Sequence, residues 1–158
     1  MSPEALIRTS LTYDPLGRKA SLNDRDMGAW SYGYDATGNL TRQTDARGQR
    51  ICLYYDSLER LAGKHYRTDD ACPSVNPSLN VSYTYDAYDP GNGQYGKGMR
   101  TGMTDSSGST SWNYDVRGRQ VGELRVVSGV GSFRTGWSYN SADLLQSMTY
   151  PGGSAGQA

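Results

Sequence analysis

The stretch Tyr34-Asp35-Ala36-Thr37-Gly38-Asn39-Leu40-Thr41 decides the fold, because its opening pattern returns along the chain. Within the repeat pattern, Tyr-Asp stands at five of six positions, and the sixth position carries Asn in place of Asp. Intervals of 21, 21, 30, 29 and 25 residues separate the repeated tyrosines. A pattern that recurs at such a period predicts a repeat architecture. The six tyrosines are Tyr13, Tyr34, Tyr55, Tyr85, Tyr114 and Tyr139.

A strand is predicted to end at each of these tyrosines. Two positions before each one stands a large apolar residue, and four positions before it a β-branched or aromatic one. A spacing of two places these side chains on one face of a strand. We therefore expect a ladder of aromatic side chains on one face, with Tyr34 and Tyr55 stacked on it. A cross-strand aromatic pair contributes about 0.2–1 kcal/mol.

A turn is predicted after each tyrosine. In the pattern D-x-x-G, the Asp carboxylate accepts a backbone N–H two residues on, and Gly adopts positive φ. Glu59 and Asp143 stand in the glycine place in two repeats, so those two turns are expected to differ. A second turn of similar chemistry completes a 21-residue unit, which is one β-hairpin. The residues predicted to define the repeat are Tyr13, Asp14, Gly17, Tyr34, Asp35, Gly38, Tyr55, Asp56, Tyr85, Asp86, Tyr114, Asp115, Gly118 and Tyr139.

The composition predicts a thin layer. The 158 residues include 13 Tyr, 3 Trp, 20 Gly and a single Phe, with a mean hydropathy of −0.72. Aliphatic side chains are too few for a thick core, whereas Tyr and Trp pack by their rings and keep a polar tip in water. We predict an all-β fold of antiparallel β-hairpin repeats, stacked into a curved or spiralling sheet.

The repeat array is predicted over residues 11–153, between an N-terminal segment, 1–10, and a flexible tail, 154–158. Two insertions, near 68–80 and 87–98, are rich in Pro, Gly, Asn and Asp. The repeat resumes in phase after each, so they are expected to be loops at hairpin tips rather than domain linkers.

The charge pattern excludes some partners. Sixteen basic and sixteen acidic residues are spread along the chain without a run of one sign. Nucleic acid or an anionic membrane needs a concentrated basic face, which this pattern lacks. No apolar run approaches the length of a membrane-spanning helix. The first residues also lack the basic and apolar regions of a secretory signal.

The repeat resembles the RHS/YD-repeat family, which includes bacterial RHS polymorphic toxins, shell-forming subunits of insecticidal toxin complexes, wall-associated proteins and the barrel of animal teneurins. The resemblance lies in residues 34–41, 114–119 and 139–145, and it spans the chain from about Leu11 to Gly153. It implies a long β-sheet that spirals into a hollow shell, which in the toxin members encloses a C-terminal toxic domain. We expect six copies to be too few to close such a shell, and no recognisable toxin domain follows the last copy in this sequence.

We therefore expect a structural segment of an extracellular or cell-surface β-shell, tube or filament. Its partners would be further YD repeats of a parent chain, copies of itself through open strand edges, or an enclosed toxin domain. Asp14-Pro15-Leu16-Gly17 is similar to the D-P-x-G-L motif near the self-cleavage site of RHS shells. Arg18 follows it in place of Leu, and the segment lies in the first repeat, so an ordinary turn is favoured.

No catalytic, cofactor or metal site is predicted. His65 is the only histidine, and with Asp69, Asp70 and Cys72 it would form a metal site or supply a general base. A second histidine and a C-x-x-C spacing are both missing, which favours a solvated loop. The sequence also lacks a nucleophile elbow. We therefore do not expect an enzyme.

Two further possibilities stay open. Aromatic faces flanked by polar side chains suit sugars, so Trp30, Trp112 and Trp137 are candidate glycan contacts of a surface adhesion module. The alternative is that they are simply the packed face of the sheet. Cys52 and Cys72 are compatible with one disulfide in an exported protein, a pairing that the sequence alone does not establish.

Overall fold

The computed structural model describes residues 8–69, 71–74 and 78–152. The chain divides into two compact units, Met1–Asn80 and Val81–Ala158. Only residues 8–10 of the predicted N-terminal segment are described, and the predicted tail, 154–158, lies outside the described residues. Among the residues that are described, none forms a helix of the length and apolarity that crossing a membrane requires.

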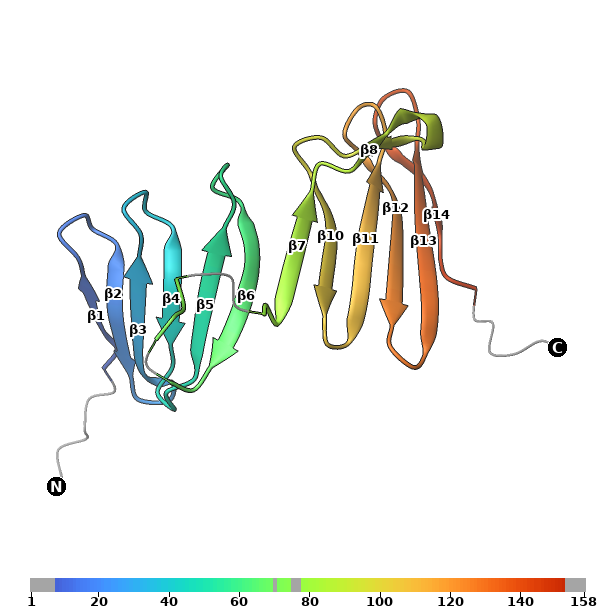
Figure 1. The fold of residues 1–158 in the computed structure, drawn as a ribbon. Coiled ribbons are helices and arrows are strands. Elements are labelled where there is room, and N and C mark those ends of the chain that lie inside the picture. Colours follow the sequence, from blue (N-terminus) through green and yellow to red (C-terminus); the bar gives the residue numbers. More distant parts are fainter. Residues whose placement is uncertain (1–7, 70, 75–77, 153–158) are drawn as a thin grey trace, which may run out of the picture. The chain divides into compact units, whose positions relative to one another are not determined.

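The first unit is a row of three β-hairpins, β1–β2, β3–β4 and β5–β6 (Figure 1). Each strand pairs antiparallel with the strand that follows it in the chain, from β1 to β6. Each Tyr-Asp turn joins the two strands of one hairpin, so these turns lie at one edge of the unit. The strands are β1 (Ser10–Tyr13), β2 (Lys19–Asp24), β3 (Gly28–Tyr34), β4 (Leu40–Thr44), β5 (Arg50–Tyr55) and β6 (Leu61–Arg67).

The second unit repeats this arrangement, with antiparallel pairing in the order β7, β10, β11, β12, β13 and β14. The all-β hairpin-repeat fold predicted from the sequence is therefore confirmed. The insertion 87–98 forms a small hairpin of its own, with β8 (Tyr88–Asp89), a 3-10 turn (Pro90–Asn92) and β9 (Gln94–Tyr95). The other strands are β7 (Val81–Tyr85), β10 (Arg100–Asp105), β11 (Gly108–Tyr114), β12 (Gln120–Val127), β13 (Gly131–Tyr139) and β14 (Leu145–Thr149).

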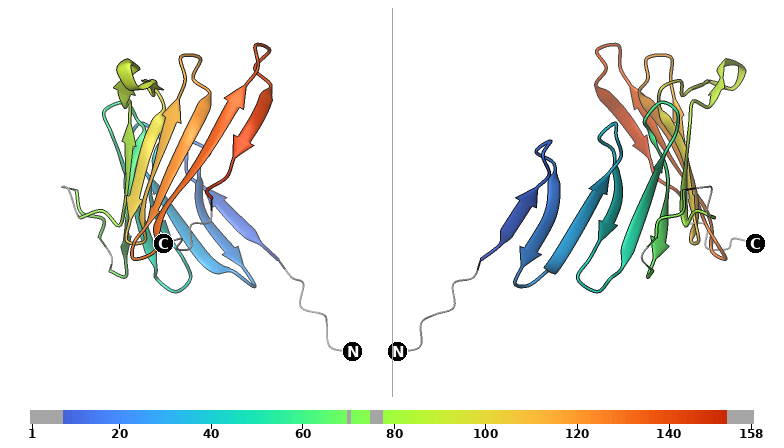
Figure 2. Two further views of the ribbon diagram at one scale, coloured as in Figure 1. Left: turned by 90° about the vertical axis from the view of Figure 1, so that its right-hand side faces the viewer. Right: turned by 60° about the vertical axis from the view of Figure 1, so that its left-hand side comes forward.

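Each unit is a single layer of strands (Figure 2). Among the described residues, the buried hydrophobic side chains are Cys52 and Val81, and the buried polar ones are Arg50, Thr101 and Thr110. The other strand side chains are half-buried or exposed. Backbone pairing and contacts between neighbouring strands therefore hold the layer, as expected for a repeat array.

One face of each unit carries the apolar side chains that precede the repeated tyrosines. Tyr32 lies opposite Gln43, which lies opposite Ile51, so alternation along the strands puts Tyr34 and Tyr55 on one face. The second unit follows the same rule, since Trp112 lies opposite Glu123, which lies opposite Thr135. We call this face of each unit the aromatic face.

The described part of the insertion 68–80 folds back over the other face of β5 instead of projecting from a hairpin tip. Alternate side chains of that strand hold it. Arg50 donates to the Asp69 carbonyl at 2.7 Å, and Tyr54 donates to the Pro73 carbonyl at 3.0 Å. Between them Cys52 is joined to Cys72 by a disulfide, with the two Cα atoms 5.6 Å apart. These three contacts fix the segment on the sheet.

Candidate functional site: the junction between repeats

The Tyr-Asp turn is built by one pattern of four hydrogen bonds, shown here for Asp115. Its backbone N–H donates to the Arg119 carbonyl at 3.0 Å, and its own carbonyl accepts from Gly118 N–H at 2.9 Å. Its Oδ1 atom accepts from the backbone N–H groups of Arg117 at 2.9 Å and Arg119 at 3.0 Å. The carboxylate therefore organises the turn by accepting two backbone donors. The same four bonds recur at Asp14, Asp35, Asp45, Asp56 and Asn140.

The third residue after the aspartate has left-handed backbone geometry. Gly118 has φ of 76°, whereas Glu59 and Asp143 have φ of 61°. A residue with a Cβ atom pays about 1–2 kcal/mol for this conformation. Glu59 and Asp143 nevertheless make the same backbone bonds as the glycines, so the expectation that these two turns differ is wrong.

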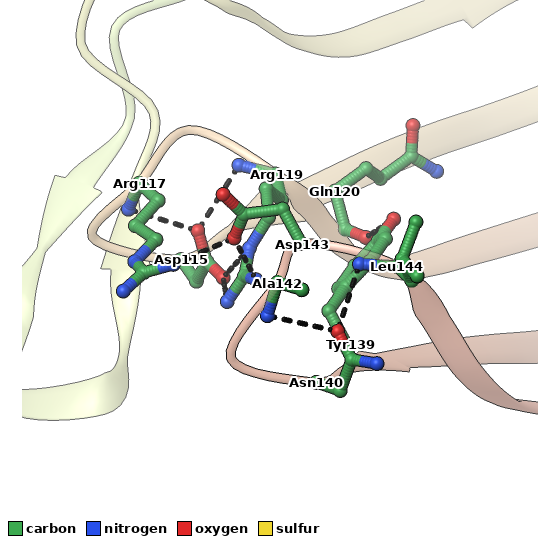
Figure 3. Close-up of polar contacts among 9 residues, drawn as sticks. All are labelled: Asp115, Arg117, Arg119, Gln120, Tyr139, Asn140, Ala142, Asp143 and Leu144. Atoms are coloured by element: carbon green, nitrogen blue, oxygen red, sulfur yellow. Dashed lines mark hydrogen bonds and ion pairs between the residues drawn. The ribbon is translucent and has the colours of Figure 1, made fainter.

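The two acidic side chains contact the turn of the preceding repeat. Asp143 Oδ1 accepts from Arg117 at 2.7 Å and from Arg119 at 2.6 Å (Figure 3). Glu59 Oε2 accepts from Thr37 at 2.9 Å and from Asn39. In both cases the donors are the second and fourth residues after the preceding Asp. Each acidic side chain thus joins two successive turns at the same edge of its unit.

The repeated tyrosine makes a second contact with the preceding repeat. The Tyr139 hydroxyl donates to the carbonyl oxygen of Gln120, and Gln120 is the strand partner of the preceding tyrosine, Tyr114. We call these contacts the inter-repeat tyrosine bonds. Each acceptor is the strand partner of the tyrosine one repeat earlier. The bonds are Tyr34 to Lys19 at 2.9 Å, Tyr55 to Leu40 at 2.9 Å, Tyr114 to Arg100 at 2.8 Å and Tyr139 to Gln120 at 2.9 Å.

In two repeats, an arginine side chain joins the turn to the next tyrosine ring. Arg18 pairs with Asp14 at 2.7 Å, and its guanidinium lies 4.6 Å from the centre of the Tyr34 ring. Arg119 pairs with Asp115 at 2.6 Å and lies 4.8 Å from the Tyr139 ring. A cation over a ring face is attracted by the ring quadrupole. On the aromatic face, these tyrosine rings therefore contact arginine side chains, whereas the sequence analysis predicted contacts between aromatic rings.

The pKa shifts of the turn carboxyls and of the repeated tyrosines favour the protonation states that their hydrogen bonds require. Partial burial raises the pKa of Asp115, but hydrogen bonds from Arg119 and from the backbone of Arg119 and Arg117 outweigh it, and the net pKa is lowered. Hydrogen bonding from Arg117 is the leading cause of the lowered pKa of Asp143. Burial raises the pKa of Tyr55 and of Tyr114, so both hydroxyls keep the proton that they donate.

The three tryptophans are half-buried on the aromatic face. Trp30 Nε1 donates to the Met27 carbonyl at 3.0 Å, and Trp112 Nε1 donates to Glu123 Oε2 at 3.0 Å. The Arg100 guanidinium lies 4.9 Å from the Trp112 ring, and Trp137 lies opposite Met148 in the β13–β14 pair. The polar tips of Trp30 and Trp112 are thus used within the sheet. Trp30 belongs to the first unit, whereas the other two belong to the second.

His65 lies opposite Cys52 in the β5–β6 pair. Its Nδ1 atom is buried, without a hydrogen-bond partner in the structure. Cys72 is taken up by the disulfide, Asp69 pairs with Arg67, and Asp70 lies outside the described residues. Over residues 8–69, 71–74 and 78–152, no three metal-ligating side chains gather at one point. Asp14-Pro15-Leu16-Gly17 forms the β1–β2 turn with the same bonds as the other repeats.

Together these junctions define an antiparallel β-hairpin repeat array, in which tyrosine hydrogen bonds join successive hairpins within each unit. Residues 28–51 and 34–70 match the model of the family described as RHS Repeat. The match covers residues 28–70, so this part of the chain is similar to RHS repeats. No curated protein sequence matches it.

Several solved structures have this fold. Chains from the crystal structures of TcdB2-TccC3-Cdc42 and of TcdB2-TccC3 align with TM-scores of 0.73, at 13% and 14% identity, over 91% of this chain. A chain from TcdB2-TccC3 without the hypervariable C-terminal region aligns with a TM-score of 0.56, at 14% identity, over 96% of it. The alignments cover 8%, 8% and 9% of those chains, so this chain spans less than a tenth of their length.

Proposed function

We propose that this chain is a structural segment of an RHS-type β-wall, part of a shell or tube, and acts without catalysis. The observation that carries the proposal is the inter-repeat tyrosine bond. It joins successive hairpins within each unit, where almost no described side chain is fully buried. A layer stabilised by its neighbours rather than by a core is suited to extending as a wall.

The wider setting is part of the same proposal. Further repeats of the same type would pair with the outer strands, β1 and β14. The resemblance to RHS toxins supports an extracellular or cell-surface location and an enclosed toxin domain as the content of the shell. The fold shared with chains of TcdB2-TccC3 complexes also supports a toxin-associated wall.

Amide hydrogen exchange of the full chain, followed by mass spectrometry, tests the wall. A wall segment needs long-lived strand pairing in its interior, so we expect slow exchange in β3–β5 and in β11–β13. In the dilute, unassociated chain, exchange should be faster in β1 and β14, which lie at the ends of the array. Exchange within seconds throughout the interior strands would overturn the proposal.

The competing function is a glycan-binding module that uses the half-buried tryptophans. Titration of the chain with a panel of glycans, followed by tryptophan emission, separates the two functions. We expect no change in emission wavelength or intensity. A saturable change that disappears in the Trp137→Ala variant would establish the binding module instead.

A further inference from the structure

The two ends of the repeat array are complementary to each other. Tyr13 carries the hydroxyl donor of the first repeat, and no preceding repeat lies within the described residues to receive it. Leu145 is the strand partner of Tyr139, so its carbonyl has the position that accepts the tyrosine of a following repeat. One end therefore presents the donor of an inter-repeat tyrosine bond, and the other end presents its acceptor.

A fixed register joins successive hairpins in both units. Each repeated tyrosine has a strand partner on the strand that follows it. The residue two positions after this partner lies opposite the residue three positions before the next repeated tyrosine. The four pairs are Ser21 with Ser31, Arg42 with Cys52, Gly102 with Ser111 and Gly122 with Gly136. Three of these four pairs contain only Gly and Ser. Applied to the ends, the same rule places Ser147 opposite Ser10, again a pair of small residues.

The outer strands also expose apolar side chains. Leu11 is 46% exposed and Tyr13 is 61% exposed, both on β1. On and beside β14, Leu145 is 56% exposed and Leu144 is 63% exposed. Leu144 occupies the same turn position as Arg18 and Arg119, whose guanidinium groups lie over the next tyrosine ring. Its apolar side chain is therefore placed to contact the exposed Tyr13 ring of another copy.

We propose that a second copy of this chain docks head to tail, with its β1 paired antiparallel to β14 of the first. Ser10 of one copy lies opposite Ser147 of the other, and Tyr13 donates to the Leu145 carbonyl. The inference rests on the proposed structural function, because it extends the wall by the junction used inside each unit. A contact between two different surfaces does not close on itself by a two-fold axis, so assembly can continue beyond a dimer.

Site-directed cross-linking of the full chain tests this register. A Ser10→Cys chain is mixed with a Ser147→Cys chain under mild oxidation, while the native disulfide stays closed. We expect mixed dimers that join residue 10 to residue 147, identified by mass spectrometry of the linked peptides. The matched control replaces Ser147→Cys by Thr149→Cys, which lies two residues out of register and should cross-link much less. Head-to-head dimers, or equal cross-linking of the control, would overturn the inference.

Sedimentation across a concentration series supplies the second test. The wild-type chain should form a distribution of species that grows with concentration. Tyr13→Phe should weaken association about fivefold, the change expected for one lost hydrogen bond. Tyr66→Phe is the control, because Tyr66 lies on β6 away from both ends and is 50% exposed. A monomer at every concentration would overturn the inference, while slow hydrogen exchange of the interior strands would still support the wall.

Discussion

The hydroxyl of Tyr55 donates to the carbonyl oxygen of Leu40 at 2.9 Å, across a separation of fifteen residues. Because Leu40 is the strand partner of Tyr34, this bond links two consecutive copies of the repeat. It satisfies a phenol that is only partly exposed, in a layer with few buried side chains. The tyrosine of the Tyr-Asp motif thus serves the junction, while the aspartate serves its own turn.

Replacing Tyr55 by Phe removes this bond and leaves the ring in place. We expect the free energy of unfolding to fall by about 0.5–1.5 kcal/mol, the usual effect of one lost hydrogen bond. Urea denaturation followed by circular dichroism measures the change. Tyr66→Phe is the matched control and should alter stability by much less. Equal losses for the two variants would show that the inter-repeat bond contributes nothing specific.

Two substitutions at Asp115 separate the turn bonds from the ion pair. Asp115→Ala leaves two backbone N–H groups without their acceptor and should cost about 1–2 kcal/mol. Asp115→Asn keeps an oxygen in the Oδ1 position, as Asn140 does in the last repeat, so it should cost clearly less. Urea denaturation in low and in high salt checks both. A loss for Asn as large as for Ala would place the energy in the ion pair with Arg119.

Glu59 holds a left-handed position that favours glycine, and its carboxylate contacts Thr37 and Asn39. Glu59→Ala removes the contacts with Thr37 and Asn39 but keeps the free-energy cost of the left-handed backbone. Glu59→Gly removes both the contacts and this cost. We therefore expect the Gly variant to be more stable than the Ala variant by about 1 kcal/mol. Thermal denaturation of the two variants beside the wild type measures the order. The reverse order would mean that the left-handed geometry costs little here.

Acid should destabilise the chain through its turn carboxylates. The pKa values of Asp14, Asp35, Asp56 and Asp115 are lowered in the folded chain by hydrogen bonds that outweigh partial burial. The stability that a lowered pKa supplies is present above the unfolded value of about 3.9, and it is lost as the pH falls through the folded values. We expect a falling unfolding midpoint in urea between about pH 4 and pH 2. A midpoint that stays constant over that range would contradict this linkage.

Opening the disulfide should destabilise the first unit. Cys52 and Cys72 are separated by 20 residues, and a cross-link that closes a loop of this length stabilises by about 3 kcal/mol. Urea denaturation with and without reductant should therefore give different midpoints. The Cys52→Ala/Cys72→Ala variant should resemble the reduced chain and should not respond to reductant. Identical midpoints for the oxidised and reduced wild type would contradict the prediction.

The local parts of the repeat could be predicted from the sequence because they depend on neighbours in the chain. The spacing of two before Tyr34 predicted a strand, and the Asp35 turn follows from side-chain chemistry within four residues. The turns at Glu59 and Asp143 were mispredicted, because the contacts that accompany their left-handed geometry come from the preceding repeat.

Contacts between repeats depend on the pairing register of neighbouring strands, which was not predicted from the sequence. The acceptors of the tyrosine hydroxyls are backbone carbonyls, so their residue types carry no signal. A signal did exist for the cation contacts, because an arginine follows the motif aspartate by four residues at Arg18, Arg60 and Arg119. The packing of the described part of the segment 68–80 on β5 depends on Arg50 and Tyr54, which donate hydrogen bonds to its backbone oxygens.

The β8–β9 hairpin shows how the Tyr-Asp turn accommodates added chain. Tyr85 and Arg100 remain strand partners although residues 86–99 lie between them, and Asp86 still accepts the backbone N–H of Gly98 at 2.7 Å. The ends of the added segment are thus held together by the same aspartate that closes the short turns. This makes the tip of the added hairpin, Pro90–Asn92, a natural place for protein engineering, where a peptide tag or an epitope can be displayed while the bonds of Gln94 to β11 are kept.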